Sequence, residues 1–174
     1  MFKTLCFPLL FILSLQGSNV MAEGALDPVA NHLAWSVFVA DSPKDCFVTS
    51  GPKKTVNKRD NVVVSVNRGK ILLYVVYRPE DKNEGTVTFT GGYPFAKDRD
   101  VTIKIDAATY EIGTNGEWAF PPNEDADKKI IAAMKSGSEA VVTALSERGT
   151  VTKDTFSLLG FTAALKDAKK RCSS

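Results

Sequence analysis

Few residues of this chain could carry out acid-base or metal chemistry. His32 is the only histidine, and a Ser-His-Asp or Cys-His nucleophile system needs an imidazole as its base. No G-x-S-x-G motif accompanies it, and Gly137-Ser138 stands where a helix is expected to end. A zinc site needs three or four His, Cys or carboxylate ligands at short spacings. The sequence therefore argues against histidine-based catalysis and against zinc.

Other common site signatures are also missing, so no cofactor is expected. Gly91-Gly92 is not part of a G-x-x-x-x-G-K or G-x-G-x-x-G phosphate loop. The acidic run at 124–127 lacks the central glycine and distal glutamate of a calcium loop, and acids at a helix N-terminus explain it. A pair of carboxylates for glycoside hydrolysis stays open, because it needs only two acids a few ångströms apart. The chain has 20 acidic residues and nothing singles out two of them.

An aromatic turn is the remaining candidate for recognition. Thr90-Gly91-Gly92-Tyr93-Pro94-Phe95 combines two glycines with an aromatic-Pro-aromatic step. A stiff loop of this kind could display Tyr93 and Phe95 as a binding surface for a protein or ligand. The alternative, which we favour, is that both rings fold over the edge of a sheet.

The first 22 residues have the organisation of a cleavable secretory signal peptide. Lys3 is followed by an apolar run from Leu5 to Leu15, and Val20-Met21-Ala22 is a small-residue cleavage site. The run is about half the roughly 20 residues that a spanning helix needs. We therefore expect residues 23–174 to form a single domain in the periplasm or outside the cell, with no membrane span after cleavage.

The charge balance does not favour a polyanionic partner. The chain has 22 basic and 20 acidic residues and a formal net charge of +2, so we expect no binding to nucleic acid. Lys53, Lys54, Lys58 and Arg59 form a local basic run. We interpret it as a solvated loop after Gly51-Pro52, the alternative being a binding patch.

The expected export determines which cysteines remain in the mature protein and whether they can form a disulfide. Cys6 leaves with the leader, so Cys46 and Cys172 remain, and two thiols in an oxidising compartment usually pair. The spacing of Phe161, Ala164, Leu165, Ala168 and Cys172 places them on one helical stripe. Cys172 is therefore expected to face the core. We predict a Cys46–Cys172 disulfide that holds the last helix on an early strand; two free thiols or an intermolecular pair are the alternatives.

The rest of the chain predicts a mainly β domain. Short strand patterns separated by turn residues are typical of antiparallel sheets. The runs at 62–66 and 71–77 are apolar on both faces, so we expect a central hairpin through Asn67-Arg68-Gly69-Lys70. Further strands are expected at these ranges: 35–39, 47–49, 86–90, 101–105, 110–112, 118–120, 139–146 and 150–158.

Two helices complete the expected fold. Asn123 can cap the first, Gly137 can end it, and Ala126, Ile130, Ala133 and Met134 would form its buried stripe. The second helix ends the chain. We therefore predict an antiparallel β-sandwich or barrel-like domain with two short helices, the C-terminal one packed on the sheet.

Several blocks of the sequence resemble the invasion-associated locus B family, a group of exported proteins of alphaproteobacteria. They are Trp35-Ser36-Val37-Phe38, Pro43-Lys44-Asp45-Cys46, the stretch from Phe89 to Phe95, Gly116-Glu117-Trp118, and the ending from Asp154 to Cys172. The ending is the most specific of them. The resemblance implies a periplasmic or envelope-associated β-rich domain and carries no catalytic residues with it.

These observations leave two main functional hypotheses. The first is a non-catalytic exported protein that binds another protein or an envelope component, with a role in host-cell invasion if the organism is a pathogen. The second is a small periplasmic hydrolase that uses paired carboxylates. A structural envelope protein without a discrete site is a third hypothesis.

Overall fold

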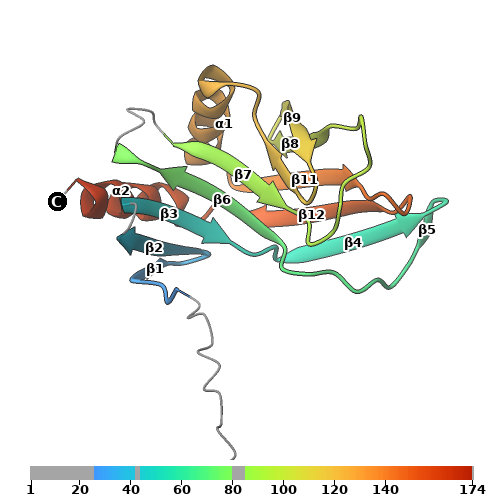
Figure 1. Ribbon diagram of the computed structural model, residues 1–174, viewed down its shortest axis with the longest axis horizontal. Coiled ribbons are helices and arrows are strands. Elements are labelled where there is room, and N and C mark those ends of the chain that lie inside the picture. Colours follow the sequence, from blue (N-terminus) through green and yellow to red (C-terminus); the bar gives the residue numbers. More distant parts are fainter. Residues whose placement is uncertain (1–25, 42–43, 80–84, 174) are drawn as a thin grey trace, which may run out of the picture.

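The computed structural model describes residues 26–41, 44–79 and 85–173. The predicted signal peptide, Met1–Ala22, lies outside these ranges. One antiparallel sheet dominates the fold (Figure 1), in the order β1-β2-β3-β6-β7-β10-β9-β8-β11-β12-β4-β5. Its strands are β1 (Ala30–His32), β2 (Trp35–Asp41), β3 (Lys44–Ser50), β4 (Lys54–Arg59), β5 (Val62–Val63), β6 (Leu72–Tyr77), β7 (Thr86–Thr90), β8 (Val101–Ile105), β9 (Ala108–Asn115), β10 (Trp118–Phe120), β11 (Glu139–Leu145) and β12 (Val151–Ser157).

The sheet folds back on itself, so its two halves enclose the core. β9 pairs with β10 on one side and with β8 on the other, which joins the first half (β1 to β10) to the second (β8 to β5). Phe89 of β7 meets Phe156 of β12 edge-on across the core, with ring centroids 6.1 Å apart. The order begins at β1 and ends at β5, which do not pair, so the sheet is not closed into a barrel. The predicted mainly β fold is confirmed.

The strands with a strict two-residue alternation form as predicted. Val87 and Phe89 of β7 are fully buried, and so is Ile103 in the middle of β8. β9 and β10 form the predicted hairpin, with Gly116 at a positive φ of 60° in its turn. An alternating pattern fixes which side chains face the core, and a one-residue slip would expose all of them.

The predicted hairpin between 62–66 and 71–77 is wrong. β5 covers only Val62–Val63 and pairs with β4, whereas β6 pairs with β3 and β7. Val62 and Val63 are 65% and 68% exposed, at the edge of the sheet. The basic run taken for a solvated loop is instead mostly β4, which pairs with β12. Cross-strand partners decide these positions, and a run of valines does not specify them.

Helix α1 (Glu124–Ser136) begins at the predicted cap, where the Asn123 side chain accepts a hydrogen bond from the Ala126 amide. Ile130 and Met134 are buried as predicted, but Ala126 and Ala133 are only partly buried. Asp127, expected only to complement the positive helix end, is buried as well. Its carboxylate accepts the Val87 amide at 2.7 Å, and burial raises the pKa of Asp127. The helix is thus tied to the start of β7.

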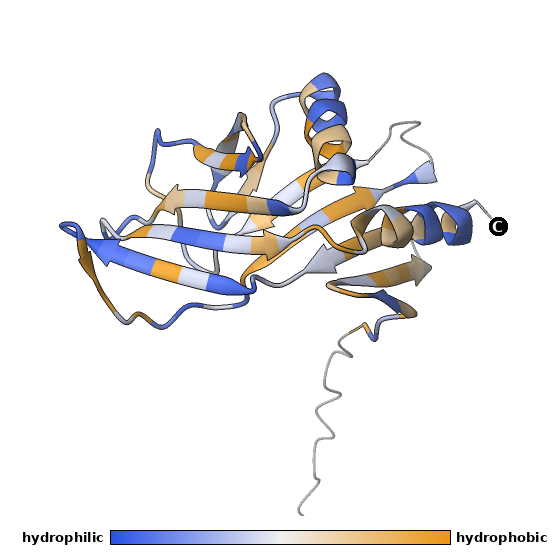
Figure 2. Ribbon diagram, turned by 180° about the vertical axis from the view of Figure 1, so that it is seen from behind, coloured by the Kyte–Doolittle hydropathy of each residue, from blue (hydrophilic) through white to orange (hydrophobic). Residues whose placement is uncertain are grey.

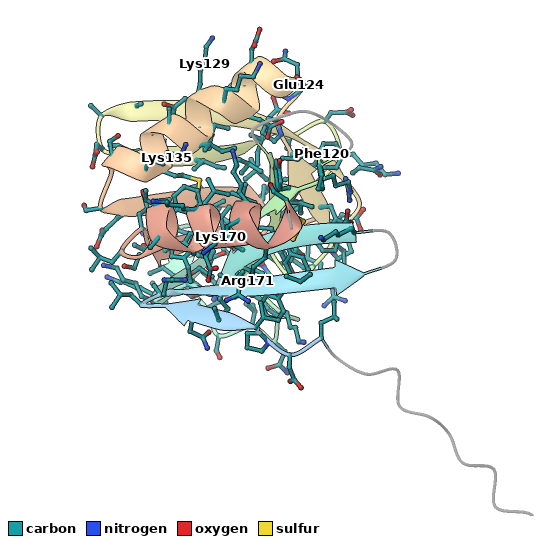
Figure 3. The ribbon with its side chains drawn as sticks, turned by 90° about the vertical axis from the view of Figure 1, so that its left-hand side faces the viewer. Phe120, Glu124, Lys129, Lys135, Lys170 and Arg171 are labelled. Atoms are coloured by element: carbon teal, nitrogen blue, oxygen red, sulfur yellow. A yellow bond between two sulfur atoms is a disulfide. The ribbon has the colours of Figure 1, made fainter. Side chains whose placement is uncertain are left out.

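Helix α2 (Phe161–Cys172) packs on the sheet through the predicted stripe, all five members of which are buried. Phe161 contacts Trp35 with ring centroids 4.8 Å apart. The predicted Cys46–Cys172 disulfide is present and links β3 to the end of α2. α1 and α2 lie side by side on one face of the molecule (Figure 3). Among the described residues, no helix has the length and apolar character needed to cross a membrane.

Candidate binding cleft

A cleft of about 510 Å³ opens where loops from both halves of the sheet meet. It is lined by residues 66–68, 92–94 and 146–148, with Arg59, Glu117, Thr150 and Thr152. Backbone hydrogen bonds hold these loops together. The Gly69 amide donates to the Gly92 carbonyl at 2.9 Å, and the Phe95 amide donates to the Gly116 carbonyl at 2.9 Å. The cleft walls are therefore fixed by the fold.

A buried ion pair lies beneath the cleft. The Arg68 guanidinium donates to both carboxylate oxygens of Asp154, at 2.8 and 2.6 Å. The Asp154 side chain is completely buried and that of Arg68 is 5% exposed. Arg68 also donates to the Gly91 carbonyl at 2.8 Å and to the Asn57 side-chain oxygen at 3.2 Å. This bidentate pair joins the loop at 66–68 to β12 and the aromatic turn, since two parallel hydrogen bonds fix both position and orientation.

Tyr93 forms part of the cleft wall, whereas Phe95 does not. The Arg68 guanidinium lies over the Tyr93 ring at 4.9 Å from its centroid, and the Tyr93 and Thr152 hydroxyls are hydrogen-bonded. Burial raises the pKa of Tyr93. Phe95 is 4% exposed and packs in the core against Phe89. Of the two aromatics considered as a possible binding surface, only Tyr93 therefore reaches the cleft.

Charged side chains of both signs surround the cleft mouth. Arg59 donates to the Thr150 hydroxyl at 2.8 Å, and Arg148 is exposed at the turn between β11 and β12. Glu117 and Glu147 line the same cleft and are exposed. The rim thus presents two guanidinium and two carboxylate groups to a bound molecule.

The cleft offers groups that suit binding. Ser146 lines it, and the Ser146 hydroxyl accepts a hydrogen bond from the Thr150 amide at 3.0 Å. His32 ends β1 and bonds to Asp167 of α2 at 3.0 Å, and neither residue lines the cleft. Among the residues that the structure describes, no three His, Cys, Asp or Glu side chains gather as metal ligands. This arrangement favours polar and charge-assisted recognition.

Sequence reasoning missed both partners of the buried pair. Arg68 lies in a segment that resembles a turn, and a single arginine gives no signal of a distant partner. Asp154 does give a weak signal of a buried partner. It lies on the same face of β12 as Thr152 and Phe156, and that face points into the core. An acid on the inward face of a strand needs a buried counter-charge.

Comparison with known proteins identifies the family. The family model described as invasion associated locus B (IalB) protein matches residues 39–169, which is most of the chain. The chain belongs to this family. None of the curated proteins matches it.

One solved structure has a similar fold. It is the crystal structure of invasion associated protein b from Bartonella henselae, with a TM-score of 0.57 and 19% sequence identity. The match covers 83% of this chain and 98% of that one. It supports the architecture described above for an IalB family member.

Proposed function

We propose that this IalB family protein acts outside the cytoplasm by binding a protein or an envelope component in the cleft, without catalysing a reaction. The cleft itself carries this proposal. Its rim offers both cationic and anionic groups, and its wall is held by the Arg68–Asp154 pair, with the Arg68 guanidinium against the Tyr93 ring. A site that is already formed loses little conformational entropy on binding.

The rim chemistry favours a polar segment that carries charges of both signs. Arg59 and Arg148 can each pair with a carboxylate or phosphate, since a guanidinium offers several donors. Glu117 and Glu147 can accept from an amine or from peptide amides. A purely anionic ligand would meet two carboxylates at the same rim, so a zwitterionic peptide segment fits better.

The hydrolase hypothesis would use Glu117 and Glu147 as its carboxylate pair, because both line the cleft. A general acid in such an enzyme needs an apolar, water-poor environment that keeps it protonated. Both glutamates are exposed, so the cleft does not provide an apolar, water-poor environment for either of them. Binding is therefore the better-supported function.

Export is part of the proposal and rests on the leader sequence, Met1–Ala22. We expect the protein in the periplasm or secreted, with its mature N-terminus at Glu23. Cell fractionation with N-terminal sequencing tests this, and protein that kept its leader in the cytoplasmic fraction would contradict it. A role in host-cell invasion belongs to the proposal only where the organism is a pathogen.

Site-specific photo-crosslinking in intact cells tests the binding function. A photoreactive residue at Pro94, an exposed position in the cleft wall, should capture the same partner reproducibly. The matched control is the exposed Ala132 on α1, which should not capture it. An Arg148→Glu substitution should reduce capture at Pro94. Equal capture at both positions, or no reproducible partner at Pro94, would count against a binding cleft.

The two glutamates separate binding from hydrolysis in the same assay. A Glu117→Gln/Glu147→Gln variant cannot supply a carboxylate pair but keeps the shape of the rim. If the protein only binds, the natural protein and the variant both capture the partner intact, and neither releases a product from it. A partner that accumulates uncleaved with the variant and is cleaved by the natural protein would favour the hydrolase.

A further inference from the structure

The second half of the sheet has an outward face rich in lysine. Lys54, Lys58 and Lys153 lie on neighbouring strands β4 and β12, where Lys58 pairs with Val151 and Lys153 pairs with Val56. Directly opposed residues of an antiparallel pair project to the same side. Lys104 of β8 shares this side, because Val141 of β11 pairs with both Lys104 and Thr155 of β12.

The positive charge of this face is mostly uncompensated. All four lysines are exposed, and none of them has an ion pair within the described part of the chain. Of the two acids on the same face, Glu139 is paired with Lys53, which leaves Glu111. In the described part of the chain, neither helix makes more than marginal contact with these strands. A nearly neutral chain thus concentrates positive charge on one open sheet surface.

Exposed valines lie beside the lysines at the end of the β4–β5 hairpin. Val63 and Val151 both pair with Lys58, so they flank it on the same face. Val63 and Val151 are 68% and 44% exposed, whereas Val62 pairs with Arg59 and projects to the opposite side of the sheet. Figure 2 shows the hydrophobic β5 next to the hydrophilic segments of β4 and β12. We call the surface formed by Lys54, Lys58, Lys104, Lys153, Val63 and Val151 the lysine–valine face.

We propose that the lysine–valine face docks onto the surface of an anionic lipid bilayer. Charge complementarity selects an anionic partner, and each lysine near such a surface strengthens binding by about five-fold. The valines select a bilayer over a soluble polyanion, because apolar side chains gain by entering the boundary between headgroups and acyl chains. The face is distinct from the cleft, so this inference does not depend on the cleft binding a partner.

Vesicle binding of matched charge variants tests the proposal. The exported protein, with the same N-terminus in every variant, is sedimented with vesicles of phosphatidylcholine containing phosphatidylglycerol. Lys54→Gln/Lys58→Gln/Lys153→Gln should weaken binding by about 100-fold, from about five-fold per lysine. The control, Lys129→Gln/Lys135→Gln/Lys170→Gln, makes the same change in net charge on the helix face (Figure 3). It should weaken binding less than five-fold.

A second variant separates a bilayer from a soluble polyanion. Val63→Thr/Val151→Thr keeps the β-branched shape that strands favour and removes apolar surface from the lysine–valine face. It should bind vesicles several-fold more weakly and bind heparin as the natural protein does. The proposal is overturned by absence of binding to anionic vesicles, by equal losses in the two lysine variants, or by unchanged vesicle binding of the valine variant.

Discussion

Replacing Asp154 by Asn should destabilise the protein by about 3 kcal/mol. The substitution leaves the Arg68 guanidinium without a counter-charge at a position that is 5% exposed, where little water can solvate it. Breaking a buried pair by removing one partner costs about 3–5 kcal/mol. The lower figure applies because the asparagine oxygen can still accept from Arg68, and the Gly91 carbonyl and Asn57 remain as acceptors.

Equilibrium urea unfolding with the disulfide intact measures this loss. The Asp154→Asn, Arg68→Met and double variants complete a thermodynamic cycle, since methionine fills much of the arginine volume without charge. Once one partner is gone, the other is left buried without its counter-charge, and replacing it as well removes that cost. The double variant should therefore be less destabilised than the sum of the two single variants, by about 2 kcal/mol.

The Arg78–Asp45 pair on the surface is the matched control. Its arginine is 47% exposed and its Nε–carboxylate distance is 3.0 Å. Arg78→Met or Asp45→Asn should each cost less than about 1 kcal/mol, because water screens and replaces an exposed pair. If Asp154→Asn also costs less than about 1 kcal/mol, or if the two losses in the buried pair simply add, the argument from burial is refuted.

Three further predictions follow from the fold. The Cys46–Cys172 disulfide joins cysteines that are 126 residues apart. Its reduction should lower the free energy of unfolding by up to about 4–5 kcal/mol. Urea unfolding with and without reductant measures this loss, and an unchanged midpoint would contradict the prediction. Asp127→Asn should stabilise the protein at neutral pH, because burial raises the pKa of Asp127 and its ionisation therefore costs stability as the pH rises above the ordinary value of about 3.9. That gain should vanish in thermal melts as the pH falls below this value, and a gain independent of pH would argue for another cause. Gly160→Ala should cost at least about 2 kcal/mol in urea unfolding, since Gly160 has a φ of 92° and an added Cβ would lie 2.0 Å from the His32 carbonyl oxygen; a smaller loss would mean that the backbone moves aside easily.

Periodicity in the sequence was sufficient for β7, β8 and α2, where one face of the element is buried and the other is wet. The alternation in β7 and β8 and the stripe of α2 each state which side chains avoid water, and the structure buries those side chains. The same reasoning predicted that Cys172 faces the core, which supported the predicted disulfide with Cys46. These features are local, because each depends on the geometry of a single strand or helix.

The pairing of strands was beyond the reach of local patterns. Val62–Val66 has the composition of a central strand, yet β5 is a two-residue edge strand, because among the described strands it pairs with β4 alone. β4 itself has the composition of a polar loop and becomes a strand through its ladder with β12. Strand pairing depends on two segments that are distant in the sequence, so the composition of one segment alone cannot predict it.

The candidate cleft shows the same division. The sequence by itself determined the mainly β fold, the helix stripe, the disulfide partners and the aromatic turn that contributes Tyr93. Only the tertiary structure decided that Arg68 meets Asp154 and that Phe95 turns into the core. It also decided that lysines of separate strands share one face. The physical reason is that burial and charge compensation depend on what lies across the fold, and Arg68 and Asp154 are 86 residues apart along the chain.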